Sequence, residues 1–108
     1  MAYAEQEAVE LAALQGRFPE WRLWRGQGGS WAATHEPLTA RQSRAGMSRT
    51  LIENTRPELL AQLEAEALTD RHVAEGYLCT VEAARLHLRD RRPCCGATGP
   101  SVETVDAP

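Results

Sequence analysis

The sequence predicts an α+β fold: a helix, a three-stranded antiparallel sheet, a second helix, and then a C-terminal helix and a disordered tail. Three observations carry this prediction. An amphipathic run with helical spacing covers residues 4–15, a glycine-rich break at 26–30 separates two aromatic segments, and a capping-box pattern at Thr55 precedes a leucine stripe. Elements in this order form a sheet with helices on one face, and they leave the other face partly open.

Length and composition set the bounds. The chain has 108 residues, of which 43% are apolar and 25% charged, as in an ordinary globular protein. We expect a single domain over 1–92 and a tail, rich in proline, glycine and small residues, over 93–108. The N-terminal segment is acidic and amphipathic, with no signal-peptide pattern and no membrane span, so we expect a cytoplasmic protein with no membrane partner.

The first helix and a hairpin account for residues 4–35. Pro19 prevents the helix at 4–15 from continuing, and residues 20–25 and 31–35 read as two strands joined by the glycine-rich connector at 26–30. This connector does not have the lysine of a phosphate-binding loop, and a strand follows it instead of a helix, so we interpret it as a turn.

The tryptophans of the hairpin cannot all serve one core. Side chains alternate along a strand, so Trp21 and Leu23 share one face and Arg22 and Trp24 share the other. A four-residue loop would place Trp24 opposite Trp31 as an aromatic pair. We therefore expect Trp21 or Trp24 to lie on the open face or at its rim.

The elements after the hairpin follow from polarity and capping signals. The polar segment 36–46 reads as a loop, and 47–53 reads as the third strand. Thr55 and Glu58 form the capping-box pattern of a helix that runs to about residue 68.

A further helical region is expected over 69–92. Gly76 is expected to interrupt it, and Thr69 and Thr80 are both possible caps. Pro93 is expected to end it.

No motif indicates catalysis or a metal site. His35 and Glu36 are adjacent, but no nucleophile elbow, metalloprotease motif or paired carboxylates accompany them, so we expect a protein that is not an enzyme. Histidine and cysteine side chains could ligate zinc, but the adjacent Cys94 and Cys95 do not fit the usual CxxC spacing, so we expect inert thiols, no metal and no cofactor. The residues considered for zinc are His72, Cys79, His87, Cys94 and Cys95.

Two groups of arginines suggest an alternative function in nucleic-acid binding, although the net charge is −3. One group lies around the polar loop and the other on the last helix, where spacing by four residues aligns side chains on one face. Such a stripe can contact phosphates, whereas the simpler interpretation is a solvated face. The residues of this alternative are Arg41, Arg44, Arg85, Arg89 and Arg92.

The run FPEWRLWRGQGGSWAATHEP, followed by TLIENTRPELLAQL, resembles small actinobacterial proteins that contain a tryptophan hairpin, a third strand and a Thr-x-x-Glu-Leu helix start. Many of those proteins are encoded beside helix-turn-helix regulators. The resemblance covers roughly half of the chain and implies no catalytic residues.

These observations favour a small regulatory module that binds a protein partner, such as a transcriptional regulator, through its sheet face. A homo-oligomeric structural protein, such as a dimer that associates through the open sheet face or a sheet edge, is a further alternative. The expected partner-binding residues are Trp21, Arg22, Trp24, Arg25 and Trp31.

Overall fold

The computed structural model describes residues 2–98, and their side chains from residue 5 onward. The chain forms two compact units. Residues Met1–Pro37 and Arg49–Leu63 make up the first, called here the sheet unit, and Leu38–Ser48 and Glu64–Pro108 make up the second, the C-terminal unit. The single domain expected over 1–92 stays a prediction. Of the expected tail, residues 99–108 lie outside the described residues, whereas 93–98 are described and contain a turn.

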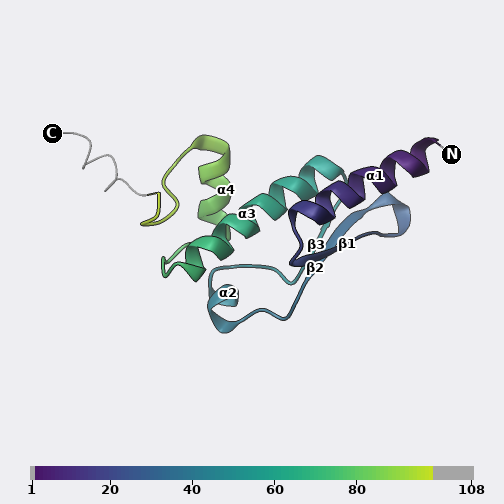
Figure 1. The fold of residues 1–108 in the computed structure, drawn as a ribbon. Coiled ribbons are helices and arrows are strands. Elements are labelled where there is room, and N and C mark those ends of the chain that lie inside the picture. The colour runs from purple at the N-terminus through teal and green to yellow at the C-terminus, as the bar shows by residue number, and fades with distance from the viewer. Residues whose placement is uncertain (1, 99–108) are drawn as a thin grey trace. The chain divides into compact units, whose positions relative to one another are not determined.

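The mixed α+β fold with a three-stranded antiparallel sheet is confirmed (Figure 1). The strands are hydrogen-bonded in the order β1-β2-β3, and all neighbours are antiparallel. The elements of the sheet unit are α1 (Ala2–Arg17), β1 (Trp21–Arg25), a 3-10 turn (Gln27–Gly29), β2 (Trp31–His35), β3 (Thr50–Glu53) and the first part of α3 (Arg56–Ala74).

The register of the hairpin, which the sequence leaves open, depends on the length of the connector. Arg25 lies opposite Trp31 and Trp24 lies opposite Ala32, so the aromatic pair that a four-residue loop would give is not formed. The connector is five residues long and is closed by a hydrogen bond from the Gly26 N–H to the Ser30 carbonyl (2.9 Å). Trp31 therefore shares a face with Trp21.

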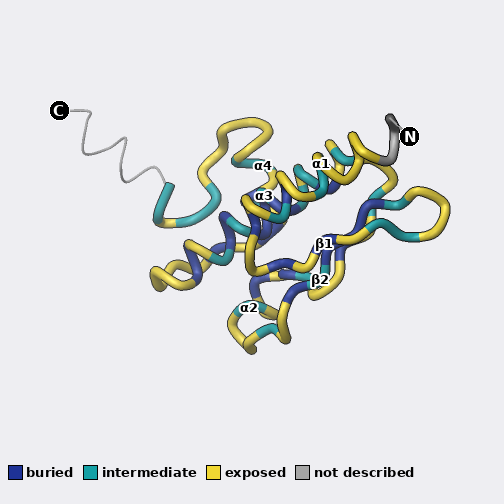
Figure 2. Tube along the Cα trace, turned by 45° about the vertical axis from the view of Figure 1, so that its right-hand side comes forward, coloured by how far each residue is buried: buried dark blue, intermediate teal, exposed yellow. Residues whose placement is uncertain are grey.

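The core of the sheet unit lies between one sheet face and the helices α1 and α3 (Figure 1). Trp21, Leu23 and Trp31 are buried on this face, and Leu59 and Leu63 of α3 are fully buried. Buried and exposed residues alternate along the first part of β1, whereas the central strand β2 is buried almost throughout and the β1–β2 connection is largely exposed (Figure 2). An ion pair between Glu10 of α1 and Arg56 of α3 (3.7 Å) joins the two helices.

Gln15 of α1 covers the free edge of β1. Its side-chain amide donates to the Trp21 carbonyl, and its side-chain oxygen accepts from the Leu23 N–H (3.0 Å). These backbone groups face away from β2 and would otherwise be an exposed strand edge. One side chain thus ties α1 to the sheet.

The C-terminal unit contains the short helix α2 (Ala40–Arg44), the rest of α3, and α4 (Val81–Asp90). The loop expected over 36–46 is wrong at α2, because Thr39 and Gln42 form a reciprocal capping box at its start. The expected third strand is shorter by three residues, because Met47 is buried in the core of the C-terminal unit instead of pairing. That core consists of Met47, Ala65, Leu68, Cys79, Val81 and Ala84.

Helix α3 continues past the expected end near residue 68 and ends at Ala74. Thr69 is not a cap: it is fully buried inside α3, and its hydroxyl donates to the Ala65 carbonyl (2.8 Å). The expected break at Gly76 and the expected cap at Thr80 are confirmed, the latter by an Ala83 N–H that donates to the Thr80 hydroxyl (3.1 Å). Among residues 2–98, no helix has both the length and the apolar character needed to cross a membrane.

Candidate functional sites

The sheet face opposite the helices carries an apolar pair, Trp24 and Ile52, which we call the outer-face pair. Trp24 is 39% exposed and Ile52 is 59% exposed, whereas Ala32, which lies between them in the register, is fully covered. The Trp24 Nε1–H donates to the Thr34 hydroxyl across the strands (3.2 Å), which fixes the indole on the sheet. Arg22 is exposed on the same face. The outer face is therefore a small apolar surface beside one arginine.

Trp21, Trp31 and Arg25, three of the expected partner-binding residues, are turned to the interior or engaged there. Trp21 and Trp31 are only 3% and 6% exposed, and Trp21 packs edge-to-face against His35, with ring centroids 4.8 Å apart. The Arg25 guanidinium lies 4.0 Å from the centre of the Trp31 ring, donates to the Gly29 carbonyl (2.8 Å) and pairs with Glu7 (3.1 Å). These contacts hold the hairpin together, and they leave Arg22 and Trp24 as the surface candidates from β1.

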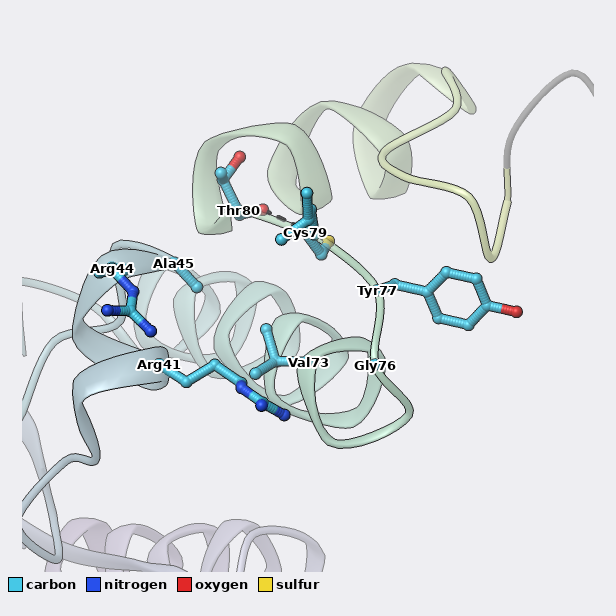
Figure 3. A pocket seen from close by; sticks show the side chains of 9 residues that line it. Arg41, Arg44, Ala45, Val73, Gly76, Tyr77, Cys79 and Thr80 are labelled. Atoms are coloured by element: carbon cyan, nitrogen blue, oxygen red, sulfur yellow. Dashed lines mark hydrogen bonds between the residues drawn. The ribbon is translucent and has the colours of Figure 1, made fainter.

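Arg41 and Arg44 line a pocket of about 400 Å³ in the C-terminal unit. The Arg41 side chain extends from α2 toward Val73, whereas the Arg44 side chain stays closer to α2 (Figure 3). Thr80, the cap of α4, also lines the pocket.

The other three arginines of the nucleic-acid alternative belong to α4 and the residues after it. Arg85, Arg89 and Arg92 are exposed and do not line the pocket. Arg89 forms an ion pair with Asp90 (3.1 Å), and the Arg92 carbonyl lies 2.7 Å from the His87 Nδ1. The expected arginine set is therefore split, and part of its charge is neutralised locally.

The structure brings His72, Cys79, Cys94 and Cys95 together in the C-terminal unit; we call them the thiol–imidazole cluster. One potential ligand atom from each residue lies within 4.8 Å of all the others. The Cys94 and Cys95 sulfur atoms are 3.9 Å apart, and they lie 3.5 and 3.3 Å from the His72 Nδ1. His87, the other histidine considered for zinc, is not in the cluster.

Three separate segments supply the cluster. His72 is in the last turns of α3, Cys79 lies between Gly76 and α4, and Cys94 and Cys95 follow α4. A turn holds the last two: the Cys94 N–H donates to the Thr98 hydroxyl (2.9 Å), and the Thr98 N–H donates to the Cys95 carbonyl (3.0 Å). Cys94 and Cys95 were expected to lie in a disordered tail. That placement is wrong, because both residues pack against the core of this unit.

Burial controls the protonation of the cluster. Burial, with smaller contributions from the neighbouring Cys94 and Cys95, raises the pKa of the Cys79 thiol to about 12. Burial, with a smaller contribution from the nearby Arg71, lowers the pKa of His72. At neutral pH the Cys79 thiol is protonated and the His72 imidazole is neutral.

Spacing rules miss this cluster because they count residues along the chain. The ligand residues here come from the end of α3, the segment after the turn at Gly76 and the segment after α4. The fold brings them together, and no CxxC pair is involved. A signal was nevertheless present: all three cysteines and one histidine flank the ends of predicted helices.

Comparison with protein-family models, curated proteins and solved structures finds no match for this chain. The resemblance to actinobacterial proteins with a tryptophan hairpin stays a prediction. The function is therefore inferred from the outer sheet face and the thiol–imidazole cluster.

Proposed function

We propose that this protein is a non-enzymatic interaction module that binds a protein partner through the outer face of its sheet. The observation that carries the proposal is the outer-face pair: Trp24 and Ile52 are exposed on either side of a covered alanine, on the face that no described helix of the sheet unit covers. Tryptophan is enriched among residues that dominate binding energy, because it offers a large and rigid apolar area.

The chemistry of the face defines the partner. Trp24 is anchored by Thr34 and needs no rearrangement to receive an apolar side chain. Arg22 adds a positive charge beside it. We infer a partner segment that presents an apolar side chain next to a carboxylate, because an arginine at the rim favours an acidic neighbour. The nucleic-acid alternative is less well supported, because its arginines are split between two places and Arg89 is paired.

Photocrosslinking from the outer face tests the proposal. A photoreactive amino acid replaces Thr50, which is exposed on the outer face, in the full-length chain, and a second chain carries it at Leu88 of α4, which is 48% exposed in the other unit. We expect adducts with a partner protein from position 50 and not from position 88. Trp24→Ala should abolish the adduct and weaken binding of the purified partner by at least about 30-fold, the equivalent of about 2 kcal/mol.

Two results would contradict this function. One is an adduct pattern that is equal at the two positions or unchanged by Trp24→Ala. The other is an adduct with twice the mass of the chain itself, which would assign the face to a homodimer and would be accompanied by concentration-dependent sedimentation. Leu88→Ala serves as the matched control, because it removes an exposed apolar side chain that does not belong to the sheet unit and should leave binding unchanged.

A further inference from the structure

We propose that the thiol–imidazole cluster is a structural zinc site, in which Cys79, Cys94, Cys95 and His72 bind one Zn²⁺ ion. This inference is independent of the sheet face, because all four residues belong to the C-terminal unit.

The interatomic distances match the edges of a zinc tetrahedron. Zn–S bonds of about 2.3 Å and a Zn–N bond of about 2.0 Å place sulfur atoms about 3.8 Å from each other and about 3.5 Å from the nitrogen. The Cys94 and Cys95 sulfur atoms are 3.9 Å apart, and their distances to the His72 Nδ1 are 3.5 and 3.3 Å. The three edges among Cys94, Cys95 and His72 therefore match, and Cys79, whose sulfur lies within 4.8 Å of the other ligand atoms, would move closer to complete the tetrahedron.

The ligand set selects the metal and its role. Thiolate and imidazole are ligands of zinc and related thiophilic ions, whereas magnesium and calcium require oxygen ligands. Four protein ligands close a tetrahedron and leave no position for substrate or water, which is the arrangement of structural sites and not of catalytic ones. Coordination through Nδ1 leaves the His72 proton on Nε2, and each thiol that binds releases its proton.

The small hydrophobic core of the C-terminal unit favours stabilisation by a metal ion that cross-links its segments. Its buried hydrophobic cluster contains one leucine, one methionine and one valine, but no aromatic side chain. Small units with a limited core commonly depend on metals or disulfides for stability. A zinc ion here would join the end of α3, the connection before α4 and the turn after α4.

The order around the ligands supports binding by adjacent cysteines. Thr98 closes the turn that carries Cys94 and Cys95, because its hydroxyl accepts from the Cys94 N–H and its own N–H donates to the Cys95 carbonyl. The same hydroxyl also lies 3.1 Å from the Cys94 sulfur. Tyr77 packs against the same turn, since a Cβ placed on Gly96 would lie 3.0 Å from its ring. The two sulfur atoms are therefore positioned together by the surrounding chain.

Metal titration of the reduced full-length protein tests the site. We expect one Zn²⁺ per chain after removal of excess metal, measured by elemental analysis. Co²⁺ used as a spectroscopic probe should give a thiolate-to-cobalt charge-transfer band and the intense d–d bands of tetrahedral coordination. Zinc should also protect the half-buried Cys94 and Cys95 from alkylation, measured by mass spectrometry; this readout needs no variant.

Matched variants locate the ion. Cys95→Ser removes a half-buried ligand and should weaken zinc binding by at least about 100-fold. This loss exceeds the loss of affinity expected when a residue that only contacts a ligand is changed. His87→Gln, at a histidine outside the cluster, should keep stoichiometry and spectrum unchanged. The proposal is overturned by a zinc-free reduced protein, by an octahedral cobalt spectrum, by Cys95→Ser with native affinity, or by a disulfide among these cysteines that persists in thiol buffer.

Discussion

At the scale of single residues, Trp21 and Trp24 occupy opposite environments on one short strand. Trp21 packs on His35 beneath the helices, whereas Trp24 lies on the outer face. Trp21→Ala should therefore destabilise the protein by about 3–5 kcal/mol, because it removes buried area and leaves a cavity. Trp24→Ala should cost less than about 1 kcal/mol. Denaturant unfolding of the two variants checks this difference, and equal losses would contradict the assignment of faces.

The alternation of these two tryptophans could be predicted from the sequence, but the face that each occupies could not. Period-two alternation separates Trp21 from Trp24 wherever the strand lies. The register depends on how the connector closes, and here the hydrogen bond between Gly26 and Ser30 makes it five residues long. That closure placed Trp31 opposite Arg25, on the same face as Trp21, and not opposite Trp24.

At the scale of elements, α1 is joined to the sheet by Gln15, whose side chain satisfies two backbone groups on the free edge of β1. We expect Gln15→Ala to lower the free energy of unfolding by about 1–3 kcal/mol, because both backbone groups lose their partner. Gln6→Ala, at an exposed position of the same helix, should change it by less than about 0.5 kcal/mol. Thermal and urea unfolding measure both, and equal effects would show that Gln15 contributes only helix propensity.

The end of α3 gives a second test at this scale. Gly76 has a φ of +97°, and hydrogen bonds from the Gly76 and Tyr77 N–H groups to Val73 and His72 carbonyls close the helix. Gly76→Ala should destabilise by about 1–2 kcal/mol, because a side chain in left-handed backbone is strained. Gly16→Ala, within α1 and in open space, should instead stabilise by about 0.5–1 kcal/mol. Urea unfolding would contradict this prediction if both changes had the same sign.

Helix starts and stops were predictable because they depend on local chemistry. The cap at Thr80 and the break at Gly76 follow from side-chain hydrogen bonding and glycine backbone freedom. The extension of α3 through Thr69 was not predictable, because burial inside the unit outweighs the preference of threonine for a cap. The short helix α2 was missed because its capping residues lie in a segment with few apolar side chains.

At the scale of the whole molecule, the thiol–imidazole cluster is a product of tertiary structure. His72 and Cys95 are far apart along the chain, and the turn at Gly76 and the return after α4 bring them together. Rules based on sequence spacing do not describe this course of the chain, so the sequence alone disfavoured a zinc site. The exposed sheet face, by contrast, follows from element order alone, because the helices cover one side of a three-stranded sheet.

The division into two units leads to a final prediction about zinc. If zinc joins three segments of the C-terminal unit, its binding should slow amide hydrogen exchange mainly over residues 75–98, because local opening of these segments would break metal bonds. Peptides from β1 and β2 contain no ligand and should change little. Hydrogen exchange followed by mass spectrometry, with and without zinc, measures both regions. Protection gained equally in the strands would mean that zinc stabilises the chain only through global unfolding, because suppression of that single transition slows exchange at every protected amide.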